Sequence, residues 1–388
     1  MQVRATKETH LWPKAEAAGQ ARGALFEGQL WSVKEEVKGK AINGNDRWYV
    51  DALGNFLWSG ELELIETASQ NAANARQRLP KPIVRPPTAK LPIYKMDWPI
   101  VKLDVDRIWP FSMGEGVKIA ILDSGLYMGH AEVNRNYVVA ARNFINGGNK
   151  VGDKIGHGTL CAGLIHAQGQ RLFGIAPAAN LLIGKVVDNQ IVDENRLLEG
   201  IKWAIEQGAH IISVSLFRES GDMSQAFRDS VSQLIKDSGV LLLASVGNDG
   251  DLGFEVNHAP ACIEGVIGIG SYDKNYQLDP DTTRTPHLDY FMPGRDVFSL
   301  GLKKHAYRRV SGTSMATAIA SGLFALLLSP KLNQNPDFKP QDLLPILDKT
   351  PKGTLSFAPR ELPSDSPKPF PDFMLAFQQT FSTDVHLT

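Results

Sequence analysis

Three short blocks of the sequence each place one reactive side chain among small neighbours. Asp123 lies in Ile-Leu-Asp-Ser-Gly, His157 in Gly-His-Gly-Thr and Ser314 in Gly-Thr-Ser-Met-Ala. A serine hydroxyl becomes an effective nucleophile when a base removes its proton, and a carboxylate orients that base. The three side chains therefore form the set that nucleophilic serine catalysis requires.

A fourth block supplies a hydrogen-bond donor. Asn248 lies in Val-Gly-Asn-Asp-Gly, directly after an apolar run, and its amide can donate to an oxyanion. Ser314 precedes a run of small and apolar residues that predicts a helix, and the first N–H groups of a helix have no internal acceptor. We therefore predict that Asn248 and the backbone N–H of Ser314 form an oxyanion hole.

Each of these residues taken alone also has a structural interpretation. An aspartate after a strand commonly caps a turn, and a serine before a helix commonly caps the helix. A nucleotide site is disfavoured because the glycines of 114–116 precede the apolar run 117–122, whereas a dinucleotide motif follows its strand. A phosphatase would need a second aspartate shortly after Asp123, and Ser-Gly-Leu follows instead. The four blocks together favour the catalytic interpretation.

Strands that alternate with helices must position these residues. Apolar runs of strand length lie at 117–122, 181–187, 210–216, 240–246 and 266–269. Helical patterns at 193–207 and 222–236 begin with Asp193 and Asp222, which we predict to be their N-caps. Buried strands alternating with amphipathic helices predict an α/β fold, a mostly parallel sheet with helices on both faces. Reactive groups gather at the carboxyl ends of such strands.

The three catalytic blocks, in the order Asp, His, Ser, resemble the signature blocks of the subtilisin-like serine proteases. The resemblance covers about residues 98–351. It implies a subtilisin-like α/β fold and a serine endopeptidase that cleaves proteins or peptides through an acyl-enzyme. Asp123, His157 and Ser314 would form its catalytic triad, and Asn248 would lie in its oxyanion hole.

The same resemblance implies the substrate-binding residues. Ser215, Leu216 and Gly247 would line the subsite for the residue before the scissile bond, with the substrate backbone added as a β-strand. Asp249 would place a carboxylate at the rim, which predicts some tolerance for basic side chains. The family binds calcium through loop oxygens that this sequence does not match residue by residue, so calcium stays unassigned. No cofactor is required, and no metal ligand is predicted.

The sequence departs from the family pattern at several places. Ala318-Ile319 stands where the family usually has Pro-His, and Phe217 stands where glycine is common. These departures leave open the alternative of a catalytically weak or inactive peptide-binding protein with the same fold. Cys161 stands near His157 in the sequence, and mercurials would inhibit the enzyme if the thiol lies behind the imidazole. The segment 91–95 resembles the short inhibitory leader of intracellular subtilisins, with a proline-bearing linker as the alternative.

Composition divides the chain into four parts. Residues 1–66 contain short alternating or apolar runs between turn signals, which predict a small all-β barrel. This part resembles the bacterial Src-homology-3-like modules, which implies a peptide or cell-wall ligand and leaves open an adaptor function. Residues 67–96 form a basic, proline-rich linker, 97–351 the peptidase domain and 352–388 a C-terminal extension.

Charge and cysteine content exclude several classes. The 388 residues include 41 basic and 42 acidic side chains, so we expect no nucleic-acid partner. Two cysteines make no disulfide framework. The longest apolar stretch, 322–328, is too short for a membrane span. The first 20 residues lack the apolar centre of a secretory signal, which favours the cytoplasm; secretion or the cell envelope applies if a signal has been removed.

Overall fold

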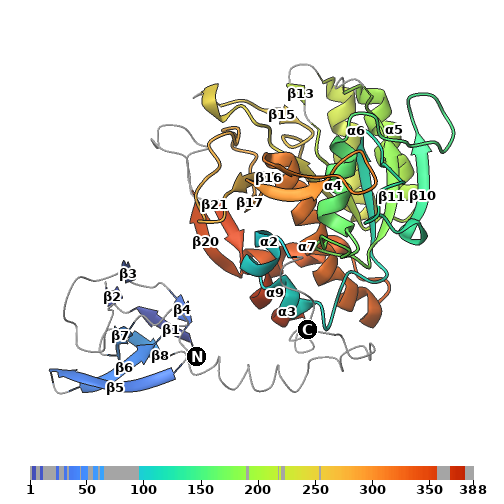
Figure 1. Ribbon diagram of the computed structural model, residues 1–388. Helices are drawn as coiled ribbons and strands as arrows, with labels where there is room; N and C mark the ends of the chain where they lie inside the picture. The colour runs from blue at the N-terminus through green and yellow to red at the C-terminus, as the bar shows by residue number, and fades with distance from the viewer. Residues whose placement is uncertain are drawn as a thin grey trace. The chain divides into compact units, whose positions relative to one another are not determined.

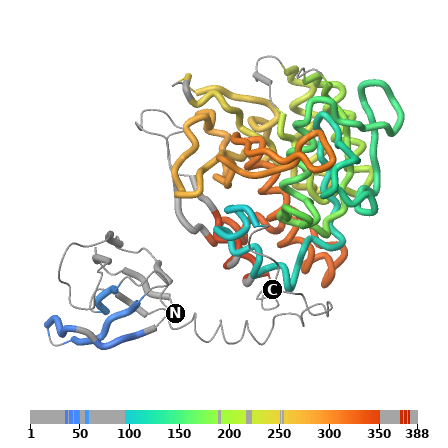
Figure 2. Tube along the Cα trace, viewed as in Figure 1, coloured from blue at the N-terminus to red at the C-terminus, as the bar shows by residue number. Residues whose placement is uncertain are grey.

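A computed structural model describes residues 2–5, 9–11, 23–25, 30–32, 35–43, 45–50, 56–59, 62–64, 96–188, 192–216, 218–219, 223–252, 255–355 and 368–380 (Figures 1 and 2). The chain divides into two compact units, Met1–Leu79 and Pro80–Thr388, which are described separately. The predicted boundaries at residues 66, 96 and 351 stay predictions.

The first unit is all-β within its described residues. Its strands are β1 (Gln2–Ala5), β2 (Thr9–Leu11), β3 (Gly23–Leu25), β4 (Leu30–Ser32), β5 (Glu35–Ile42), β6 (Asn45–Val50), β7 (Phe56–Trp58) and β8 (Leu62–Leu64). They pair antiparallel in three small sheets, ordered β4-β1-β8, β2-β3 and β5-β6-β7. The predicted turn at Asn43 joins β5 to β6, and Trp48 and Leu57 are fully buried. The all-β prediction is thereby confirmed, and a closed barrel is not shown.

The second unit is built on a seven-stranded sheet whose described strands are all parallel. In spatial order these are β10 (Val138–Asn143), β11 (Asn180–Lys185), β9 (Lys118–Asp123), β12 (Ile211–Val214), β14 (Leu241–Ser245), β16 (Ile267–Tyr272) and β17 (Tyr290–Pro293). The five central strands match the apolar runs of the sequence. The edge strands β10 and β17 were not predicted, because β10 is half-exposed and polar at its end and β17 is short and ends in proline.

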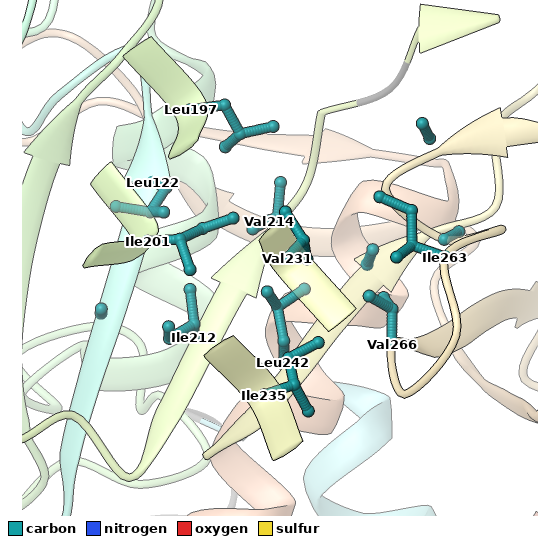
Figure 3. Packing of buried hydrophobic residues seen from close by; sticks show 14 of the residues in the cluster. Leu122, Leu197, Ile201, Ile212, Val214, Val231, Ile235, Leu242, Ile263 and Val266 are labelled. Carbon is teal, nitrogen blue, oxygen red and sulfur yellow. The ribbon is translucent and has the colours of Figure 1, made fainter. Parts of the chain in front are cut away.

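Helices cover both faces of this sheet (Figure 1). They are α4 (His157–His166) and α7 (Thr313–Gln334) on one face, and α5 (Glu194–Glu206) and α6 (Gln225–Ser238) on the other. Figure 3 shows the core under α5 and α6, where Leu122, Ile212 and Leu242 extend from adjacent strands. Their chain neighbours Ile121 and Leu243 are equally buried and point to the opposite face, because side chains alternate along a strand. The predicted α/β class is confirmed.

The helix starts are set by short polar side chains. Asp193 caps α5 as predicted, since its carboxylate accepts from the backbone N–H of Arg196 at 2.9 Å. The prediction for α6 was wrong: its N-cap is Ser224, whose hydroxyl accepts from Phe227 N at 3.2 Å. The N-cap lies two residues later than Asp222, because serine satisfies the free N–H groups as well as aspartate does.

The helix α7 crosses the centre of the second unit. It is long and apolar enough to cross a membrane by length and composition alone, but 89% of its most apolar window is buried inside the protein. That burial identifies a core helix.

Shorter elements complete the second unit. They are α2 (Trp98–Lys102), α3 (Val105–Ile108), β13 (Arg218–Glu219), β15 (His258–Ala259), β18 (Val297–Leu300), β19 (Tyr307–Val310), α8 (Leu344–Asp348), β20 (Pro351–Leu355), β21 (Lys368–Pro371) and α9 (Phe373–Thr380). The hairpin β18–β19 leads directly into α7. The helix α9, in the C-terminal extension, packs on α3 and α7.

Candidate active site

Asp123 and His157 meet at the carboxyl edge of the sheet. Asp123 is the last residue of β9 and His157 the first of α4. The imidazole Nδ1 lies 3.0 Å from Oδ1 and 2.9 Å from Oδ2 of the carboxylate, which is 1% exposed. Gly158 permits this approach, because a Cβ there would lie 2.2 Å from the carbonyl oxygen of Gly125.

The charge of Asp123 controls the protonation of His157. Attraction to the carboxylate raises the pKa of His157 well above its usual value of 6.5, although burial acts in the opposite direction. A carboxylate bonded to Nδ1 favours a proton on that nitrogen, which leaves Nε2 available to accept one. This pair can accept a proton from a hydroxyl and stabilise the resulting imidazolium.

Ser314 is the second residue of α7, and 6% of it is exposed. Its hydroxyl donates to the carbonyl oxygen of Ser215 at 3.1 Å, and the Ser215 hydroxyl donates to the carbonyl oxygen of Ser314 at 2.9 Å. Between His157 and Ser314, both described, no hydrogen bond is formed. The structure thus joins Asp123 to His157 and Ser314 to Ser215, all at junctions of strand ends and helix starts.

Contacts between Thr313 and the side-chain oxygen of Asn248 determine the orientation of the Asn248 amide nitrogen. Oδ1 accepts from the backbone N–H of Thr313 at 2.9 Å and lies 3.0 Å from its hydroxyl, whose one proton it shares with the carbonyl oxygen of Gly247. With both acceptor positions of Oδ1 engaged, Nδ2 is turned away from Thr313, and its two N–H donors remain to bind a negative oxygen. A Cβ on Gly312 would lie 3.3 Å from this nitrogen.

The predicted substrate-binding residues flank these groups. Ser215 and Leu216 follow β12, and Gly247 follows β14, the neighbouring strand. Gly247 has φ +106°, a conformation that favours glycine, and its carbonyl oxygen accepts from the Thr313 hydroxyl at 3.1 Å. Phe217, which departs from the family pattern, and the segment 91–95, which resembles an inhibitory leader, lie outside the described residues.

Sequence reasoning missed a polar network that joins the end of β9 to the start of α4. Asp153 is 8% exposed, and its carboxylate accepts from Ser124 Oγ at 3.0 Å, from Gly156 N at 2.8 Å and from Thr159 N at 2.9 Å. The Ser124 hydroxyl accepts in turn from Gly158 N at 2.9 Å. An aspartate four residues before a histidine that begins a helix was the available signal, because such residues satisfy free N–H groups.

A buried lysine supports the same junction. Lys185 ends β11 opposite Asp123 in the sheet register, is 6% exposed and donates from Nζ to the carbonyl oxygen of Ser124 at 2.7 Å. Lys185 therefore binds the residue that directly follows Asp123.

Cys161 lies beside the imidazole, which was the condition for the predicted inhibition by mercurials. Its Sγ is 4.0 Å from Nδ1 of His157, and the residue is fully buried. Burial raises the pKa of its thiol. Asp123, His157 and Cys161 place ligand-type atoms within 4.8 Å of one another, but Nδ1 of His157 is already bonded to the carboxylate.

Comparison with known proteins identifies the family. The model of the subtilase family matches residues 114–354, more than half of the chain. The chain is 34% identical over 226 residues to the major intracellular serine protease of Bacillus subtilis (strain 168), which covers 56% of this chain and 69% of that protein. It is 30% identical over 235 residues to subtilisin DY of Bacillus licheniformis, and the matched region covers 60% of this chain and 83% of that protein.

A solved structure supports the fold. The prenylagaramide maturation protease PagA superposes with a TM-score of 0.61 at 24% identity, covering 71% of this chain and 98% of that chain. The first unit lies outside the region that the family model matches. The chain belongs to the subtilase family and is a subtilisin-like serine endopeptidase.

Proposed function

We propose that Ser314 is the nucleophile of this peptidase, that His157 is its general base and acid, and that Asp123 orients the imidazole. The observation that carries this assignment is the pair of contacts at 2.9 and 3.0 Å between Nδ1 of His157 and the Asp123 carboxylate. A serine without an oriented base is a weak nucleophile, and this pair supplies the oriented base that Ser314 needs.

Each half of the reaction then involves two proton transfers. The Ser314 hydroxyl turns from the Ser215 carbonyl to Nε2 of His157, gives up its proton and attacks the substrate carbonyl carbon. His157 next donates that proton to the leaving amine, which leaves an acyl-enzyme. Water repeats the sequence and releases the new carboxylate. Side chains and backbone supply every group, so the reaction requires no cofactor.

The oxyanion of each tetrahedral intermediate binds between two donors. Nδ2 of Asn248 and the backbone N–H of Ser314, at the positive end of α7, provide them. Removal of one such donor lowers kcat by roughly 10²–10³-fold in this class of site. Ser215, Leu216 and Gly247 bind the substrate residue before the scissile bond, because they are the strand ends that flank Ser314 and Asn248.

A fluorophosphonate probe tests the assignment, because it forms a covalent bond only with an activated serine. The wild-type chain should become labelled and should cleave a peptide library, and Ser314→Ala should lose both properties. Ser213→Ala is the matched control, since Ser213 is equally buried on β12 but its hydroxyl has no partner among the described residues. A wild-type chain that resists the probe and binds peptides without cleaving them would instead be the inactive peptide-binding alternative.

We further propose that the first unit is a Src-homology-3-like barrel that binds a peptide or a cell-wall ligand. Its antiparallel strands and the buried Trp48 and Leu57 support this proposal. Sedimentation with peptidoglycan and a peptide array would test it. The full-length Ser314→Ala chain should bind, and the same variant lacking residues 1–79 should not.

A further inference from the structure

A second histidine–aspartate pair lies beside Asn248. Nε2 of His258 is 2.6 Å from Oδ2 of Asp249, the residue that follows Asn248. The histidine side chain is 4% exposed, whereas that of the aspartate is 36% exposed. The proposed reaction uses neither residue.

Gly247 connects this pair to the active site. A Cβ on Gly247 would lie 2.3 Å from Cδ2 of His258, so the imidazole packs directly against the glycine backbone. The carbonyl oxygen of the same glycine accepts from Thr313, which precedes Ser314. Gly247 therefore separates His258 from Thr313 and Ser314 at the start of α7.

The substrate residue before the scissile bond must come close to this layer. Its carbonyl carbon bonds to Ser314 Oγ, and its carbonyl oxygen lies against Asn248 in the proposed intermediate. Its α-carbon is one covalent bond further, and Gly247, on whose backbone His258 packs, is among the residues proposed to bind its side chain. Asp249, which the resemblance places at the rim of this subsite, is bonded to the same histidine.

The Asp249 carboxylate is already engaged there. A lysine or arginine side chain that bound it would compete with a 2.6 Å hydrogen bond and would leave the buried imidazole without that acceptor. A buried imidazole that loses its hydrogen-bond partner costs more free energy than a new ion pair between Asp249 and the substrate would return. His258 therefore competes with a basic substrate side chain for the Asp249 carboxylate.

We propose that His258 is a specificity-determining residue that makes the peptidase discriminate against lysine and arginine before the scissile bond and accept neutral side chains. This inference rests on the proposed assignment of Ser314 and Asn248. His258 acts through its hydrogen bond to the Asp249 carboxylate, so its effect requires that carboxylate.

The test compares two peptides that differ only in lysine or leucine before the scissile bond. The measured quantity is the ratio of kcat/KM for the lysine peptide to that for the leucine peptide. The wild-type ratio should lie well below one. His258→Ala should raise it about 10-fold, the scale of one charge-assisted hydrogen bond. The double variant H258A/D249N should return the ratio to the wild-type value.

Two further variants keep the result decisive. Asp249→Asn alone should leave the ratio within about 3-fold of wild type, because the carboxylate is already occupied. A 10-fold fall in this variant would overturn the proposal even if His258→Ala does not fold, as would a wild-type ratio above one. His305→Ala, an exposed histidine of the same unit, should change nothing. Cleavage of the leucine peptide that is not lost in Ser314→Ala would instead overturn the proposed nucleophile.

Discussion

Ser314 and Ser215 exchange two hydrogen bonds across the junction of α7 and β12. The Ser314 hydroxyl donates to the carbonyl oxygen of Ser215 at 3.1 Å, and the Ser215 hydroxyl donates to that of Ser314 at 2.9 Å. The first bond must break for the hydroxyl to turn to His157, whereas the second can persist and hold the start of α7 in place.

Ser215→Ala removes only the second bond. We expect a stability loss of about 1 kcal/mol, because one buried hydrogen bond disappears, and a several-fold fall in kcat from looser placement of Ser314. Thermal unfolding and peptide kinetics measure both. Ser213→Ala is the matched control, since the Ser213 hydroxyl has no partner within the described residues, and it should leave kcat unchanged. Equal effects of the two variants would contradict the role of Ser215.

Asp123→Asn should change the pH profile as well as the rate. Activity requires the neutral imidazole, so kcat/KM rises with pH through the pKa of His157. The carboxylate raises this pKa, and its removal should move the acid limb to lower pH. The plateau should fall about 10⁴-fold, as it does when other triads lose this charge. An acid limb that stayed in place would show that Asp123 does not set the pKa.

Asp153→Asn should lower kcat by roughly 10- to 100-fold with little change in KM, because the network that it anchors sets the position of His157. Glu132→Gln is the matched control. Its carboxylate is also buried and also accepts backbone N–H groups, from Gln170, Arg171 and Leu172. Both variants should lose stability, but the control should keep its kcat. If kcat fell equally in both, the effect of Asp153 would be one of general stability.

A small mercurial should inactivate the enzyme by bonding to Cys161. The metal displaces the thiol proton and places a bulky group on a sulfur that lies 4.0 Å from Nδ1 of His157. Iodoacetamide should react far more slowly, because burial raises the pKa of the thiol and little thiolate is present near pH 7. Cys161→Val should resist the mercurial, and Cys262→Ser should remain sensitive. Sensitivity that followed Cys262 instead would place the reactive thiol elsewhere.

Phe377→Ala should destabilise the second unit by about 3–5 kcal/mol, the usual cost of removing a buried phenyl ring. The ring lies 6.2 Å, between centroids, from that of Phe111, which is three residues after the end of α3. Urea unfolding measures the loss, and KM should not change. Val101→Ala, at a side chain that is 52% exposed, should stay within about 0.5 kcal/mol of wild type.

The local pattern of the sequence was sufficient for the five central strands of the sheet and for a proposal of the reactive groups. Runs of strand length marked the five central strands, and small-residue blocks marked Asp123, His157 and Ser314. Periodicity and turn chemistry are short-range properties, so a single chain displays them. The same rules failed at the two edge strands, where partial exposure weakens the apolar pattern, and at Ser224, where two capping residues competed.

Only the tertiary structure decided which side chains support the reactive ones. Lys185 reaches Ser124 across 61 residues, Asp153 reaches it across 29, and Ser215 meets Ser314 across 99. His258 shows the point most clearly: nothing in its neighbourhood along the chain assigns it to Asp249, and on this contact we base the proposal that the enzyme discriminates against basic side chains. Such contacts depend on how strand ends are brought together by sheet order, and no local pattern of residues encodes that order.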